Sequence, residues 1–170
     1  MITPHRTLFG AAWLAAFSPL VVPLVAQAKE IAYDQISCWS ATMNAPVATA
    51  DGVAVGSYEL RGIIVRSNLE DKSAENRTFH CVAVYRAGGK EAADDGYCKI
   101  VTAEGDYMVV QTARSAPLPA EGTRTILYGT GRFAGIKGGG TSRQINRGAP
   151  ATPGTLQGCN HDKGKYTLPD

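Results

Sequence analysis

The chain has 170 residues, with 17 Lys or Arg against 15 Asp or Glu and a net charge of +2. Because this surplus is small and no basic cluster with interleaved aromatic residues occurs, we expect no nucleic-acid partner. The length corresponds to one domain that can bury a sizeable core.

Residues 1–28 have the form of a cleaved signal peptide. His5 and Arg6 precede an apolar run from Leu8 to Val25, and Ala26-Gln27-Ala28 is a small-x-small cleavage site. A retained membrane anchor is the alternative, since the run is near the lower length limit for a span. The prolines inside it favour cleavage. We therefore expect a periplasmic or secreted protein whose single domain is residues 29–170, with no membrane span after processing.

Eight short β-type runs follow the leader, rich in Val, Ile, Thr and Tyr and separated by Gly, Pro, Asp and Asn. No long helical pattern occurs. In chain order the predicted strands are Ile36–Thr42, Tyr58–Val65, Thr78–Arg86, Tyr97–Thr102, Asp106–Thr112, Thr123–Tyr128, Ser142–Asn146 and Lys165–Leu168, of which the first and last are the weakest. The pattern predicts an all-β fold with a single antiparallel sheet.

The sequence also predicts the type of connection between these runs. Ala103-Glu104-Gly105 is a tight hairpin signal, and the proline-containing segments Arg114–Gly122 and Arg147–Gly158 read as longer loops. Residues Ser67–Arg77 are polar and predict a loop or one helical turn. In Thr78–Arg86, alternation places Phe79, Cys81, Ala83 and Tyr85 on one face of the strand.

Four cysteines remain after the leader, and an even count in an exported chain predicts two disulfides. Three pairings are possible from spacing alone. If residues 88–91 form a four-residue hairpin loop, Cys81 lies directly opposite Cys98, at a separation that a disulfide tolerates. We therefore expect Cys81–Cys98, which leaves Cys38–Cys159 to join the two ends of the domain.

Six of the thirteen residues from Gly129 to Thr141 are glycine, directly after a β-type run. The first part matches a dinucleotide-binding loop, but such a loop needs a following helix, which this glycine content disfavours. We expect no cofactor. Glycine in a strand more often marks a bend or a close backbone approach, so Gly129, Gly131, Gly135 and Gly138 are predicted to be structural. Phe133 and Ile136 are predicted core residues.

The run Tyr128–Gly138 resembles the segment shared by plant dirigent proteins, allene oxide cyclases and bacterial exported proteins of the same barrel type. The resemblance implies an eight-stranded antiparallel barrel related in shape to calycins, often assembled as dimers or trimers. The catalytic positions of the plant enzymes do not align with this chain, so catalytic residues stay unknown.

Other clusters of possible metal ligands or acid–base residues give only weak evidence of a site. Cys159-Asn160-His161-Asp162 lacks the second ligand pair that a zinc site needs, so we expect no metal site and interpret the cluster as a solvated C-terminal turn. Asp94-Asp95, Glu104 and Asp106 could act as acids or bases, but beside Gly96 and Gly105 they read as turn formers.

Tyrosines are the remaining candidates for ligand binding. Core packing is their default role, but tyrosines at a barrel mouth would suit a flat apolar ligand. The candidates are Tyr58, Tyr85, Tyr107 and Tyr128. We expect a non-enzymatic exported barrel that binds a small apolar ligand or acts through self-assembly. The alternatives are a cyclase- or dirigent-like enzyme that constrains a reactive substrate in its cavity, and a protein-interaction module.

Overall fold

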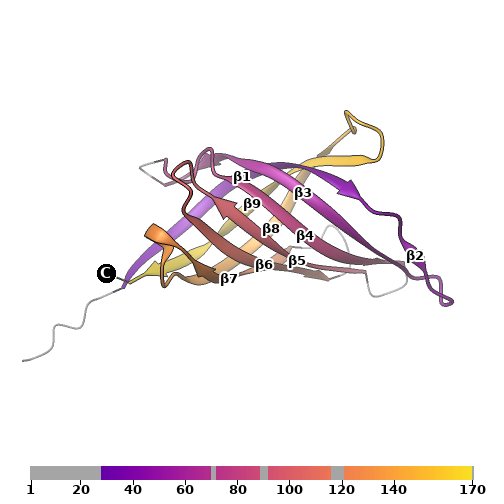
Figure 1. Cartoon of the computed structure of the whole chain (residues 1–170), viewed down its shortest axis with the longest axis horizontal. Helices are drawn as coiled ribbons and strands as arrows, with labels where there is room; N and C mark the ends of the chain where they lie inside the picture. The colour runs from indigo at the N-terminus through magenta and orange to yellow at the C-terminus, as the bar shows by residue number, and fades with distance from the viewer. Residues whose placement is uncertain (1–27, 70–71, 89–91, 116–120, 170) are drawn as a thin grey trace, which may run out of the picture.

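The computed structural model describes residues 28–69, 72–88, 92–115 and 121–169 (Figure 1). Its strands are β1 (Lys29–Met43), β2 (Val47–Ala48), β3 (Ala54–Ser67), β4 (Thr78–Ala87), β5 (Ala93–Val101), β6 (Tyr107–Ser115), β7 (Gly122–Gly129), β8 (Lys137–Gly148) and β9 (Thr155–Leu168), with one 3-10 turn, η1 (Gly131–Phe133). The predicted signal peptide lies, apart from Ala28, outside the described residues. Within the described ranges, no helix is long and apolar enough to cross a membrane.

The strands form a closed antiparallel barrel. Each strand from β3 to β8 pairs with the next in the chain, and β1 closes the wall by pairing with both β9 and β3. The short strand β2 is additional and pairs only with the start of β3. The predicted all-β, eight-stranded barrel is therefore confirmed, with β2 as one extra strand.

Both predicted disulfides are present. Cys81 on β4 lies directly opposite Cys98 on β5, and both side chains are buried in the barrel interior. Cys38 on β1 lies opposite Cys159 on β9, so this bond joins the first and last strands of the wall. The local hairpin argument thus placed the first bond correctly, and elimination placed the second.

The two end strands are much longer than predicted. The run Ile36–Thr42 lies within the 15-residue β1, and Lys165–Leu168 is only the last part of the 14-residue β9. The predicted loop Arg147–Gly158 is shorter than expected and covers only residues 149–154, because β8 continues to Gly148 and β9 starts at Thr155. The backbone ladders on both sides of β9 impose an extended conformation on a polar, glycine-containing sequence that predicts no strand by itself.

One end of the barrel is filled by apolar side chains. Phe133 and Ile136 are 2% and 3% exposed, and they pack with Ile64, Val110 and other core residues. The Arg77 guanidinium lies 5.0 Å from the centre of the Phe133 ring, in cation–π range. This plug closes one end of the barrel and leaves the other end as the place for a cavity.

Candidate functional site

A cavity of about 580 Å³ lies at the end of the barrel away from the Phe133 plug. We call it the mouth cavity. Apolar and aromatic side chains form most of its wall, and they come from the end of β1, the start of β3, the end of β4 and the start of β9. They include Trp39, Ala41, Met43, Tyr58, Leu60, Tyr85 and Leu156. The volume is within the range of about 300–1,000 Å³ typical of small-molecule sites.

A smaller space of about 60 Å³, the inner chamber, lies deeper in the barrel. It shares part of its lining with the mouth cavity, namely Trp39, Tyr58, Leu60, Arg114 and Asn160. Its remaining lining includes the Cys81–Cys98 pair and the polar side chains of Arg124 and Asp162. The interior therefore becomes more polar between the apolar mouth cavity and the apolar plug.

Asp94, Arg114 and Tyr58 form a polar group in the wall of the mouth cavity. An Asp94 carboxylate oxygen lies 3.8 Å from the Arg114 guanidinium, and their side chains are 13% and 19% exposed. Burial raises the pKa of the Asp94 carboxyl above its usual range, although Arg114 opposes the shift. Burial also raises the pKa of Tyr58 to about 12, with a further contribution from Asp94. The site thus places a carboxyl group with a raised pKa and a neutral phenol against an apolar cavity.

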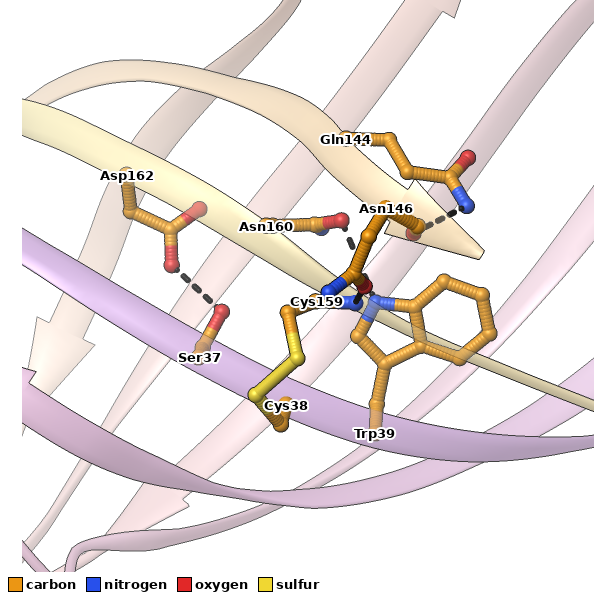
Figure 2. The surroundings of a disulfide bond; sticks show 8 residues. All are labelled: Ser37, Cys38, Trp39, Gln144, Asn146, Cys159, Asn160 and Asp162. Atoms are coloured by element: carbon orange, nitrogen blue, oxygen red, sulfur yellow. Dashed lines mark hydrogen bonds between the residues drawn. A yellow bond between two sulfur atoms is a disulfide. The ribbon is translucent and has the colours of Figure 1, made fainter. Parts of the chain in front are cut away.

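Arg124 on β7 and Asp162 on β9 form a buried ion pair at the inner chamber. Arg124 Nη1 lies 2.7 Å from Asp162 Oδ2, and their side chains are 10% and 2% exposed. The Ser37 hydroxyl donates a 2.8 Å hydrogen bond to the same carboxylate oxygen (Figure 2). Burial alone would raise the pKa of the Asp162 carboxyl, but the Arg124 guanidinium and the Ser142 and Ser37 hydroxyls outweigh it. The pKa therefore lies below its usual range, and Asp162 is a carboxylate.

Glycine on the intervening strand makes room for a tyrosine in the interior. Gly140 on β8 lies between the two strands, opposite Arg124 on one side and Gly164 on the other. A Cβ at Gly140 would clash with the Lys163 carbonyl and lie 2.7 Å from the Tyr33 hydroxyl. Because Gly140 and Gly164 have no side chains, Tyr33 can occupy the interior beside them. This close approach explains part of the glycine-rich segment.

The Trp39 indole is held between the two cavities. It donates a 3.1 Å hydrogen bond from Nε1 to Asn160 Oδ1, and Asn160 Nδ2 donates one of 3.2 Å to Ser142 Oγ. Figure 2 shows the Trp39 ring beside Asn160, next to the Cys38–Cys159 disulfide that joins β1 and β9. The hydrogen bonds fix the ring where a ligand in the mouth cavity would contact it.

The structure separates the four candidate tyrosines. Tyr58 and Tyr85 line the mouth cavity, with ring centres 6.3 Å apart. Tyr107 and Tyr128 pair with each other elsewhere and line neither the mouth cavity nor the inner chamber, and Tyr128 is 52% exposed. The candidate set therefore divides between the cavity and the outer surface.

Two sequence interpretations of acidic residues are wrong. Asp94 and Asp95 are not in a turn but in β5, where Asp94 faces the mouth cavity. The cluster from Cys159 to Asp162 is not a solvated turn but part of β9. Alternation places Asp162 in the interior, while His161 Nε2 lies 2.6 Å from Asp34 Oδ1. Among the described residues, no group of three His, Cys, Asp or Glu side chains could hold a metal ion.

Sequence reasoning missed most of the polar residues of the site. They are Trp39, Arg114, Arg124 and Ser142, together with the inward roles of Asp94, Asn160 and Asp162. Alternation from Tyr166 back along β9 would have placed Asp162 inside, had the strand been recognised. By contrast, Glu104 and Asp106 do lie at a hairpin, where both contact Arg132 at 3.0 and 3.3 Å.

The predicted structural glycines lie around the plug. Gly131 and Gly135 have φ values of +53° and +73°, a region that disfavours other residues. A Cβ at Gly129 would lie 2.5 Å from the Phe133 Cβ. The segment thus turns the chain from β7 through η1 into β8 while keeping Phe133 against the wall, with no phosphate-binding helix after it.

Comparison with known proteins supports the architecture. No family model matches the sequence, and no curated protein matches it. Among solved structures, the fold is similar to that of the pterocarpan synthase dirigent protein GePTS1, with a TM-score of 0.53. The two share 11% sequence identity over 89% of this chain and 99% of that chain. The chain therefore has a dirigent-like β-barrel fold; the resemblance to allene oxide cyclases stays a prediction.

Proposed function

We propose that this protein is an exported barrel that binds a small, mainly apolar molecule in the mouth cavity. The observation that carries the proposal is the cavity of about 580 Å³ with an aromatic and aliphatic wall. A barrel interior filled by side chains would have left no room for a ligand. Export is supported by the two disulfides, which persist in oxidising compartments, and by the leader-like residues 1–28.

The wall suits a ligand with an apolar body and few polar groups. Trp39, Tyr58 and Tyr85 offer aromatic faces, while Leu60 and Leu156 supply aliphatic contact. Of the charged groups in the wall, Asp94 and Arg114 already pair with each other. Hydrophobic burial therefore provides most of the affinity, and a few hydrogen bonds set the orientation.

A dirigent-like enzyme that orients a reactive substrate is the second candidate. The specific observation in its favour is the Asp94 carboxyl, whose pKa is raised by burial and which lines the cavity beside Tyr58. A carboxyl with a raised pKa is a better proton donor near neutral pH than an ordinary aspartate. Both candidates require the same cavity, and product formation from a bound compound would distinguish catalysis from binding.

The direct test is native mass spectrometry of the protein purified from its own host, followed by a binding screen with lipids and phenols. Trp39 reports on binding, because the only other tryptophan, Trp13, belongs to the predicted leader. We expect a retained small molecule, or a shift in Trp39 fluorescence together with a thermal shift. If no compound is retained and none in the screen has an effect, the proposal is wrong.

A matched pair of variants locates the site. Ala41→Phe places a ring in the mouth cavity, whereas Thr42→Phe places one on the exposed face of the same strand. Ala41→Phe should weaken binding at least tenfold, and Thr42→Phe should leave it unchanged. Equal effects of the two substitutions would place the ligand elsewhere.

A further inference from the structure

The outer face of the barrel carries an apolar patch over β4 and β5. Val82 and Val84 on β4 and Tyr97 on β5 point outward, and they are 50%, 54% and 48% exposed. Val82 lies directly opposite Tyr97 in the ladder, so the three side chains adjoin on one face. We call them the outer patch. Because Cys81 and Ala83 between them are buried, β4 is apolar on both faces here, and an exposed apolar cluster of this kind indicates a surface that another molecule covers.

Two charges of opposite sign flank Tyr97. Asp95 and Lys99 are two residues before and two residues after it on β5, so the three side chains share the outer face. Asp95 accepts a 3.1 Å hydrogen bond from Gln111 Nε2. Lys99 Nζ lies 4.2 Å from the centre of the Tyr107 ring. Within the described part of the chain neither charge forms an ion pair. The β5 part of the patch thus has a negative end and a positive end, with Tyr97 midway between them.

This arrangement of charges is complementary to itself. A two-fold axis that passes through Tyr97, in the plane of contact and perpendicular to β5, sets the β5 strands of two copies antiparallel. Asp95 of each copy then faces Lys99 of the other, with Tyr97 against Tyr97 at the centre. If the two strands ran parallel, Asp95 would face Asp95 and Lys99 would face Lys99. Like charges in contact oppose association, so the charges favour the antiparallel pairing.

The neighbouring strands are compatible with this pairing. Val82 is level with Tyr97 and therefore meets Val82 of the second copy. Glu59 on β3 lies opposite Val82 on its other side, but its carboxylate already contacts Arg61 and His80 at 3.4 and 3.3 Å. The outside of a barrel is also convex, so the two surfaces diverge away from the axis and β3 lies at the edge of the contact. Because the contact is small, we expect an affinity in the micromolar range.

We propose that two copies of this chain pair through the outer patch, with antiparallel β5 strands and Tyr97 on the two-fold axis. The same surface serves in both copies, as in other closed dimers. Burial of the apolar side chains drives association, and the two ion pairs between Asp95 and Lys99 fix the orientation. The proposal is independent of the proposed function, since none of the outer patch lines the mouth cavity and no ligand is needed.

Charge reversal tests the orientation. Sedimentation of the processed protein over a hundredfold range of concentration should show a monomer–dimer equilibrium. Lys99→Asp and Asp95→Lys each place like charges in contact, and each should weaken dimerisation at least tenfold. The double variant Asp95→Lys with Lys99→Asp restores two pairs of opposite charge and should return to within about threefold of the wild-type Kd. A double variant no tighter than either single variant would overturn the proposal.

Cross-linking tests the position of the axis. A residue on a two-fold axis lies against itself, so Tyr97→Cys should join two chains by a disulfide when the protein is oxidised with copper phenanthroline. Lys163→Cys is the control, because Lys163 is 57% exposed on β9 and does not belong to the outer patch. Non-reducing electrophoresis and peptide mapping identify the linked cysteines. Equal cross-linking at the two positions would contradict the proposal.

The oligomeric state of the wild type gives a further decision. A protein that stays monomeric at every concentration would show that the outer patch does not pair two copies. A trimer would also overturn the proposal, because a three-fold axis cannot place Tyr97 against Tyr97 in a single pair. These measurements report mass and not ligand binding, so their failure leaves the proposed function of the mouth cavity untouched.

Discussion

Arg124 Nη1 lies 2.7 Å from Asp162 Oδ2, although β8 separates the two strands that carry these residues. The residue opposite Arg124 on β8 is Gly140, and Ser37 on β1 donates a hydrogen bond to the same Asp162 oxygen. The pair therefore depends on three strands at once. It also separates the apolar plug from the mouth cavity, so it contributes to both the stability and the shape of the interior.

Removing one partner of this pair should be strongly destabilising. Asp162→Ala leaves the Arg124 charge buried without a counter-charge, and we expect a loss of about 3–5 kcal/mol in the free energy of unfolding. The double variant Arg124→Met with Asp162→Leu should remain within about 2 kcal/mol of the wild type. Urea denaturation followed by Trp39 fluorescence measures both. Glu59→Gln, which removes a 51%-exposed carboxylate paired with Arg61, is the control and should cost less than about 1 kcal/mol.

The same pair should make the barrel sensitive to acid. The pKa of Asp162 is lower in the folded protein than its unfolded value of about 3.9. Its contribution is therefore complete above about pH 5 and is lost as the pH falls through the folded pKa. Stability measured from pH 6 downward, to about pH 2, should decrease more steeply in the wild type than in the double variant. Parallel curves for the two proteins would contradict this assignment.

Gly140 should tolerate no side chain, unlike Gly148 on the same strand. A Cβ at position 140 would clash with the Lys163 carbonyl and with Tyr33, whereas the nearest contact at position 148 is 3.9 Å away. We expect Gly140→Ala to lower the free energy of unfolding by about 3 kcal/mol or more. Gly148→Ala should change it by less than about 0.5 kcal/mol. A mild effect at position 140 would mean that β8 and β9 can separate locally.

The Cys38–Cys159 disulfide, which joins β1 and β9, should stabilise the protein more than the Cys81–Cys98 disulfide in the interior. Cys38 and Cys159 are 121 residues apart in sequence, and Cys81 and Cys98 are 17 apart. In the chain-entropy model the two bonds contribute about 5 and about 3 kcal/mol. Paired Cys→Ala variants of each bond, compared by chemical denaturation, test this order. The reverse order would show that the cavity left at Cys81 and Cys98 outweighs the difference in loop length.

Local sequence patterns were sufficient to predict much of the barrel wall. The hairpin between β4 and β5 brings Cys81 opposite Cys98 because its register follows from a short loop. The run of glycines around Phe133 predicted bends instead of a phosphate loop, since no helix-forming residues follow it. Alternation assigned Phe79, Cys81, Ala83 and Tyr85 to one face of β4, and three of them line the inner chamber.

The interior polar groups followed from the tertiary structure alone. The sequence predicted that Asp94, near Gly96, was a turn former and that Asp162 belonged to a solvated C-terminal turn. Their burial depends on Arg114 and Arg124, which belong to strands folded against them from other parts of the chain. The sequence by itself determined the strand type, the Cys81–Cys98 bond and the plug, all of which rest on short-range periodicity and spacing, and Cys38–Cys159 followed by elimination. Only the closed barrel decided which charges are buried and where space remains, because each depends on side chains from several strands at once.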